Sequence, residues 1–145
     1  MSEKSKVLVT GATGRIGRTL MEGLEESFTL TGTSRSPNDD PRFIQVDYKE
    51  PEEVCLAFSQ QDAVIHLHGN ASNDYDSLGE YLEPNIVDVY TTYEAARQAG
   101  VQRVIFASSN HATGWTEIVG ERASADSMFR PDGIYGAAKV SFVCV

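Results

Sequence analysis

The chain of 145 residues carries 21 acidic and 12 basic side chains, a formal net charge of −9. A length of this size is typical of one folding domain, and we expect a single domain over residues 1–145. The acidic balance excludes a nucleic-acid surface, because phosphate contacts need clustered lysine and arginine. No apolar run is long enough to span a bilayer, and the N-terminal residues have no signal-peptide layout. A cytoplasmic location without a membrane partner is therefore expected.

Five short apolar runs alternate with helical patterns along the chain. The first run, KVLVT, is apolar at nearly every position, which is typical of a parallel strand covered on both faces. The helical patterns repeat apolar residues every three or four positions, as Ile16, Leu20 and Leu24 do. The expected strands cover residues 6–10, 28–34, 42–46, 62–69 and 101–108, and the expected helices cover 14–26, 51–59, 83–99 and a last helix from 133.

This alternation predicts an α/β fold, a Rossmann-type doubly wound parallel sheet. The expected strand order is 3-2-1-4-5 with right-handed crossovers. In the helix over 83–99, Pro84 is expected in the first turn and Gly100 just past the end. The segment from Asn110 to about Asp132 is expected to be a long loop, and such loops are usually functional.

Three glycines, Gly11, Gly14 and Gly17, form G-x-x-G-x-x-G between the first strand and the first helix. Glycine allows a tight turn and lets backbone N–H groups approach a pyrophosphate. The helix N-terminus adds a partial positive charge. Because a strand precedes the pattern and a helix follows it, the pattern predicts a dinucleotide-binding loop. A purely structural glycine turn is the alternative.

The end of the second strand indicates which dinucleotide is bound. NAD-binding versions of this fold place an acid here for the ribose 2′-OH, whereas this chain has Ser34 and Arg35 and no carboxylate before Asp39. A guanidinium pairs well with a 2′-phosphate, so NADP is preferred over NAD, and a solvated Arg35 is the alternative. Asp47, after the third strand, is a candidate acceptor for the adenine amino group, with a strand-end or cap role as the alternative.

Tyr135 and Lys139 are four residues apart on the last expected helix and so share a face. A phenol has an ordinary pKa of about 10 and is a poor base at neutral pH. A nearby ammonium and an oxidised nicotinamide are expected to lower that pKa, so that Tyr135 takes a proton from an alcohol as hydride leaves for the cofactor. Ser108 and Ser109 are candidates to hold the substrate oxygen, and only one should face the cofactor, because side chains alternate along a strand.

Other chemistry-bearing residues carry less information. His66 and His68 are two apart on an expected strand and hence on one face, but a metal needs a third ligand and none is nearby. We therefore expect no metal, and backbone or cofactor packing for these rings. Cys55 and Cys144 form no disulfide framework. Trp115 either walls a sugar or covers the core.

The motifs VTGATGRIG, SSNH and YGAAK together resemble the extended short-chain dehydrogenases/reductases of the NAD-dependent epimerase/dehydratase superfamily. The segments EPNIVDVYTTYEAARQAGVQRVIFASSNHATG and RPDGIYGAAK resemble uronate dehydrogenases and related archaeal sugar-phosphate dehydrogenases, and the resemblance runs from about Lys6 to Lys139. It implies an NAD(P)-dependent oxidation of the C1 hydroxyl of an aldose, uronic acid or sugar phosphate to a lactone, by a homodimer.

The resemblance also implies roles for single residues. Ser109 matches the catalytic serine, Tyr135 the base and Lys139 the lysine that also holds the nicotinamide ribose. Asn85 matches the asparagine that holds a water against that lysine, and a polar residue in a first helical turn is its alternative. The candidates for substrate binding are Ser72, Asn110 and His111. The candidates for cofactor binding, from the glycine loop onward, are Gly11, Thr13, Gly14, Arg15, Ile16, Gly17, Ser34, Arg35, Asp47, Leu67, His68 and Gly69.

The chain departs from the uronate enzymes in two places. Those enzymes carry an acid near Ser34, and they continue the last helix and then add two strands and a small substrate region, which we expect this chain to lack. A nucleotide-binding module without turnover is therefore a competing hypothesis. A nucleotide-sugar epimerase or dehydratase is another, against which the SSNH stretch argues, as does the lack of a visible further acid/base pair beside Tyr135.

Overall fold

The computed structural model describes residues 3–72 and 77–143, so Cys144 lies outside the described residues. The chain divides into two compact units. The first unit comprises Met1–Gly69 and Asp88–Ala107, and the second comprises Asn70–Val87 and Ser108–Val145. Within the described ranges, no helix has the length and apolar character needed to cross a membrane.

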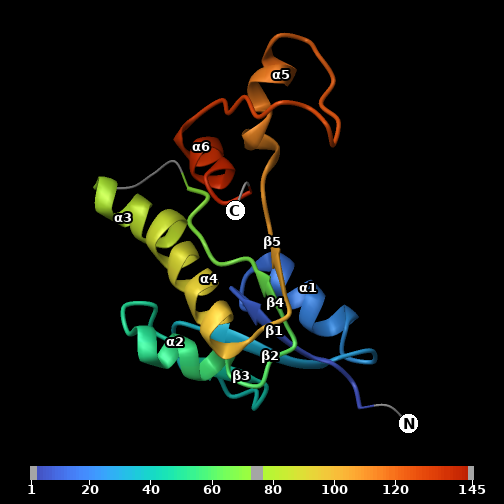
Figure 1. The fold of residues 1–145 in the computed structure, drawn as a ribbon, viewed down its shortest axis with the longest axis vertical. Helices are drawn as coiled ribbons and strands as arrows, with labels where there is room; N and C mark the ends of the chain where they lie inside the picture. Colours follow the sequence, from blue (N-terminus) through green and yellow to red (C-terminus); the bar gives the residue numbers. More distant parts are fainter. Residues whose placement is uncertain (1–2, 73–76, 144–145) are drawn as a thin grey trace. The chain divides into compact units, whose positions relative to one another are not determined.

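The first unit is built on a five-stranded parallel sheet with the order β3-β2-β1-β4-β5 (Figure 1). This order confirms the predicted Rossmann-type fold. The strands are β1 (Lys6–Thr10), β2 (Thr29–Ser34), β3 (Phe43–Gln45), β4 (Ala63–His66) and β5 (Arg103–Phe106). The carboxyl ends of β1 and β4 are neighbours, because Thr10 pairs with His66.

Helices cover both faces of this sheet, which explains why β1 and β4 have consecutive apolar residues at 7–9 and 63–65. On one face, Leu8 and Val64 pack with Phe58 and Ala95 from two helices. On the other face, Val7 and Val9 pack with Met21 from the helix that follows β1. The helices of this unit are α1 (Arg15–Gly23), α2 (Pro51–Phe58) and α4 (Asp88–Ala99).

The second unit consists of short helical segments. They are α3 (Leu78–Leu82), the π-helical η1 (Glu83–Val87), the 3-10 helix η2 (Asn110–Ala112), α5 (Gly114–Ile118) and α6 (Ile134–Val140). Helix α6 packs against η2 and also contacts η1. The prediction of an irregular loop from Asn110 to Asp132 was therefore wrong in its first part, because the cap at Ser109 starts η2 and α5 follows at once.

The helix predicted over 83–99 also differs from the structure. Ser77 caps α3 by accepting a hydrogen bond from the Glu80 N–H at 3.3 Å, so the helical path begins earlier than predicted. Pro84 lies inside η1, and its predicted place in a first turn was wrong. Proline has no N–H for the α-helical bond to the fourth residue before it, and here a short π-helical segment interrupts the α-helical path. Gly100 follows the last residue of α4 with φ of 72°, as predicted for a C-terminal glycine.

We expect Gly17→Ala to destabilise the first unit, although alanine is the better helix former. A Cβ at Gly17 would lie 2.5 Å from both the Ala12 Cα and the Gly11 carbonyl oxygen, so α1 would have to move away from the turn. Such overpacking costs about 1–3 kcal/mol. Gly23→Ala in the same helix has no neighbour within 4 Å and should raise the free energy of unfolding. Urea denaturation followed by circular dichroism measures both, and a stabilised Gly17→Ala would contradict the packing argument.

The same reasoning applies to Gly136, at which α6 meets η2. A Cβ there would overlap the His111 carbonyl group, so Gly136→Ala should lower the free energy of unfolding by about 1–3 kcal/mol and separate α6 from η2. Gly133→Ala is the matched control, because Gly133 has extended backbone and no neighbour within 4 Å. Equal effects of the two substitutions in urea denaturation would show that this contact does not hold α6.

Candidate functional site

The glycine loop passes directly over the chain that leaves β4. Gly11 has φ of 64°, and a Cβ on it would lie 3.0 Å from the His68 backbone nitrogen. The Gly14 N–H donates to the Gly11 carbonyl at 3.0 Å and closes the turn. Gly14 then forms the N-cap of α1 and has no side chain with which to cap the first N–H groups. These N–H groups and the missing Cβ atoms fit a pyrophosphate at the start of α1.

Thr10 supports this loop from beneath and was not among the predicted site residues. Its Oγ1 accepts hydrogen bonds from the N–H groups of Leu67 and His68, each at 3.1 Å. Because these two donors take both lone pairs, the Thr10 hydroxyl donates its proton to Nδ1 of His66, 2.9 Å away. Thr10 therefore fixes the backbone of the segment that Gly11 contacts. A hydroxyl directly before the first glycine was the signal in the sequence.

The imidazole ring of His68 contacts two other side chains of the first unit. Its Nε2 lies 2.8 Å from Oδ2 of Asp88, and its ring stacks on Tyr48 with 4.5 Å between the centroids. Burial raises the pKa of Tyr48 to about 12, so this phenol stays neutral. β4 ends at His66, so the prediction that His66 and His68 share a strand face was wrong. Among the described residues, no group of three His, Cys, Asp or Glu side chains is placed to hold a metal ion.

At the end of β2, Arg35 is exposed and Ser34 is buried. The Ser34 hydroxyl donates to the Ser36 carbonyl at 2.6 Å, so it already has a partner within the turn. The Gln45 side chain donates to the Arg35 carbonyl at 3.1 Å and holds the backbone there. Arg35 is thus the side chain at this strand end that can turn toward a phosphate.

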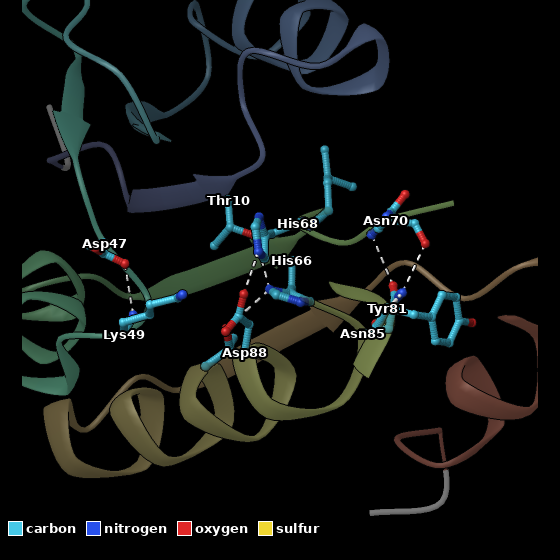
Figure 2. Close-up of polar contacts among 11 residues, drawn as sticks. Thr10, Asp47, Lys49, His66, His68, Asn70, Tyr81, Asn85 and Asp88 are labelled. Atoms are coloured by element: carbon cyan, nitrogen blue, oxygen red, sulfur yellow. Dashed lines mark hydrogen bonds and ion pairs between the residues drawn. The ribbon is translucent and has the colours of Figure 1, made fainter. Parts of the chain in front are cut away.

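Asp47 takes part in a local turn. Its Oδ1 accepts a hydrogen bond from the Lys49 N–H at 2.9 Å (Figure 2), which is the geometry of an Asx turn. The side chain thus has a local role after the end of β3, in agreement with the strand-end alternative, whereas the N-cap of α2 is Glu50. Its contact with adenine stays a prediction.

Asn85 lies in η1 and is only 3% exposed, so it is not a polar residue of a first helical turn. Its Nδ2 donates to the carbonyls of Asn70 and Tyr81, both at 2.9 Å, and its Oδ1 accepts from the Asn70 N–H at 3.0 Å (Figure 2). The amide therefore holds Asn70 by both backbone groups. Asn70 in turn accepts from the Ser72 N–H through its own side chain at 2.9 Å.

Ser109 lies where the chain enters η2. Its Oγ accepts from the His111 N–H at 3.2 Å and lies 3.4 Å from Oδ1 of Asn110. The ring of His111 meets the Tyr135 ring edge to face, with 6.0 Å between the centroids. The packing of α6 on η2 therefore brings the predicted base into the same unit as the SSNH stretch.

Tyr135 and Lys139 lie together, but not with the predicted electrostatics. The Nζ of Lys139 is 5.6 Å from the centroid of the Tyr135 ring. Burial lowers the pKa of Lys139 and raises the pKa of Tyr135. The expected lowering of the phenol pKa was therefore wrong for the chain by itself, because the sequence argument counted the ammonium and left out desolvation, which disfavours both charged forms.

A second pair of titratable side chains, His111 and Asp132, lies beside Tyr135 and was not predicted from the sequence. Nδ1 of His111 lies 2.8 Å from Oδ2 and 3.0 Å from Oδ1 of Asp132. The Asp132 carboxylate occupies the space that a Cβ on Gly114 would need. The expectation that no further acid/base pair lies near Tyr135 was thus wrong. Nothing in the sequence places residue 132 beside residue 111, because backbone hydrogen bonds across the intervening segment create this contact.

The predicted site residues separate by role between the two units. The second unit holds Ser109, Tyr135, Lys139 and Asn85, together with the substrate candidates Ser72, Asn110 and His111. The first unit holds every cofactor candidate, from the glycine loop residues, including the exposed Thr13, Arg15 and Ile16, to Leu67, His68 and Gly69.

Comparison with known proteins agrees with this geometry. Residues 7–143 match the model of the NAD dependent epimerase/dehydratase family. The chain is 38% identical to a uronate dehydrogenase of Pseudomonas putida over 141 residues, covering 93% of this chain and 52% of the relative. It is 32% identical to an L-arabinose 1-dehydrogenase (NAD(P)(+)) of Haloferax volcanii, and this match covers 94% of this chain and 58% of the relative.

Solved structures show the same relation. The crystal structure of uronate dehydrogenase from Agrobacterium tumefaciens superposes with a TM-score of 0.79 at 33% identity, covering 94% of this chain and 52% of that one. The chain thus spans about half the length of the curated relatives it matches. The parallel sheet, the glycine loop over β4 and the family match across residues 7–143 together establish that this chain belongs to the NAD dependent epimerase/dehydratase family.

Proposed function

We propose that this chain carries the nucleotide-binding and catalytic residues of an NAD(P)-dependent sugar dehydrogenase. The reaction is oxidation of the C1 hydroxyl of an aldose, uronic acid or sugar phosphate to a lactone. The observation that carries the proposal is the packing of α6, with Tyr135 and Lys139, on the η2 segment that Ser109 caps. The similarity to a uronate dehydrogenase and an L-arabinose 1-dehydrogenase supports a sugar as the substrate.

In this proposal, six of the predicted site residues in the second unit have assigned roles. The Ser109 hydroxyl holds the C1 oxygen, and the Tyr135 phenolate takes the hydroxyl proton, so that a carbonyl forms at C1. NAD or NADP, when bound, would supply the acceptor for the hydride that leaves C1. Lys139 stabilises the phenolate by its positive charge, and Asn110 and His111 contact other hydroxyls of the sugar. Asn85 holds the segment at Asn70, which places η1 against α6.

Burial raises the pKa of Tyr135, so its base form needs positive charge nearby. The ammonium of Lys139 and an oxidised nicotinamide are the two sources of that charge. The phenolate forms as the pH rises through the pKa of Tyr135. The proposal therefore requires a rate of oxidation that increases with pH.

The test is reduction of NAD or NADP by the 145-residue chain with hexuronates, L-arabinose and glucose 6-phosphate, followed by absorbance. Tyr135→Phe should lower kcat about 10²-fold or more, because the proton acceptor is lost. Lys139→Met should move the rise of kcat to higher pH. The exposed Tyr90 on α4 supplies the control Tyr90→Phe, which should leave the rate unchanged. Nucleotide binding without turnover on any sugar would instead favour the binding-module hypothesis.

We further propose that NADP binds more tightly than NAD. The support is the exposed Arg35 after β2, where the Ser34 hydroxyl is already bonded and no carboxylate stands before Asp39. A charge-assisted hydrogen bond contributes about 1.5–3 kcal/mol, roughly a tenfold or greater change in affinity. A homodimer and a cytoplasmic location stay predictions.

Arg35→Ala should therefore weaken NADP binding about tenfold or more and leave NAD binding within about twofold. Isothermal titration of both nucleotides measures this difference. Arg122→Ala removes another exposed arginine, in the second unit, and controls for the change in net charge. A preference for NADP that persists in Arg35→Ala would show that Arg35 does not cause the preference.

A further inference from the structure

We propose that Asp132 is a positioning residue that holds His111 in the tautomer with its proton on Nδ1, so that Nε2 accepts a hydrogen bond from a sugar hydroxyl. The sugar in this statement rests on the proposed function, whereas the tautomer does not. The consequence is substrate specificity: His111 Nε2 binds a sugar hydroxyl only as a hydrogen-bond donor.

The contacts of the His111 ring determine which nitrogen carries the proton. Nδ1 lies within hydrogen-bond distance of both carboxylate oxygens of Asp132, at 2.8 and 3.0 Å. An ionised carboxylate has no proton to donate, so Nδ1 must be the donor. In a neutral imidazole the other nitrogen then carries a lone pair and only accepts.

The position of Asp132 is set by backbone contacts and by shape. Its N–H donates to the His111 carbonyl at 3.3 Å, and the Arg130 N–H donates to the Ala112 carbonyl at 3.0 Å, so residues 130–132 run along η2. The carboxylate then fills the space beside Gly114 that any larger residue would occupy. The side chains of Asp132 and His111 are 22% and 50% exposed, so the geometry of the chain around them, more than burial, holds this contact.

The ring held in this way belongs to the catalytic part of the second unit. His111 meets the Tyr135 ring edge to face, and its backbone N–H donates to the Ser109 hydroxyl at 3.2 Å. Nε2 is the ring nitrogen that Asp132 leaves available. An acceptor in such a site loses its partner when a substrate has hydrogen or a methyl ether in place of a hydroxyl, and an unpaired polar group of this kind lowers affinity strongly.

The other two histidines provide an internal reference, because the chain has three in all. His66 receives the Thr10 hydroxyl proton at Nδ1, so its own proton is on Nε2. His68 places Nε2 at 2.8 Å from the Asp88 carboxylate, so this nitrogen also carries a proton. His111 is therefore expected to differ from both rings of the first unit.

Two-bond ¹H–¹⁵N correlation spectra of the uniformly labelled chain, recorded above the pH at which imidazoles are protonated, report the tautomer of each ring. The expected result is one histidine with bare Nε2, assigned to His111 by its loss in His111→Gln, and two with protonated Nε2. Asp132→Ala should release His111 to populate the other tautomer. A wild-type His111 with its proton on Nε2 would overturn the proposal.

Gly114→Ala tests the same contact without removing a charge, because the new methyl group displaces the Asp132 carboxylate. It should change the His111 signals as Asp132→Ala does. Asp126→Ala, an exposed loop substitution, should not. Unchanged signals of His66 and His68 show in each variant that the first unit is folded. A His111 tautomer that neither Asp132→Ala nor Gly114→Ala alters would also overturn the proposal.

Adding a hexuronate or L-arabinose with NAD separates this inference from the proposed function. A bound sugar should shift the His111 Nε2 signal, and Asp132→Ala should raise KM about tenfold with little change in kcat, as expected for loss of one hydrogen bond to substrate. A His111 in the expected tautomer whose Nε2 signal no sugar moves would overturn the assignment of this nitrogen to a sugar hydroxyl. The turnover assay decides independently whether the dehydrogenase proposal fails.

Discussion

Within each unit, close contacts at glycine residues bring segments together at the places where the predicted site residues lie. In the first unit, Gly11 lies against the backbone of residues 67–68 and Gly17 lies against Ala12, so the start of α1 stays beside the ends of β1 and β4. In the second unit, Gly136 lies against His111 and Gly114 lies against Asp132. A Cβ at Gly17 or Gly136 would overlap backbone atoms and force two segments apart, whereas a Cβ at Gly114 would displace the Asp132 side chain.

Polar side chains also stabilise these segments, by hydrogen bonding to backbone groups that have no partner in a strand or helix. The Thr10 hydroxyl satisfies two N–H groups just after β4, and the Asn85 amide satisfies both backbone groups of Asn70. Residues 67–72, the described part of the chain after β4, form no strand or helix, so their backbone groups need other partners, such as side chains. Loss of either partner would leave buried donors or acceptors unpaired, which costs more than the hydrogen bond itself contributes.

Electrostatics in the second unit disfavour the phenolate of Tyr135, which the proposed oxidation needs. Burial makes both the phenolate of Tyr135 and the ammonium of Lys139 harder to form than in water. A cationic cofactor ring would favour the phenolate and so link proton removal to cofactor binding. Asp132 orients the His111 ring beside Tyr135, and an oriented imidazole can recognise a hydroxyl by a hydrogen bond.

The sequence by itself determined the sheet, its strand order and the glycine loop, because apolar runs, helical spacing and glycine are local signals. It also determined that Tyr135 and Lys139 share a helical face, since a spacing of four residues is enough for that. The tertiary structure alone decided that Pro84 lies in a π turn, that Asn85 holds Asn70, and that Asp132 reaches His111. It also decided the direction of the Tyr135 pKa shift. Each of these depends on contacts between residues far apart in the chain, or on burial, and neither is encoded in local spacing.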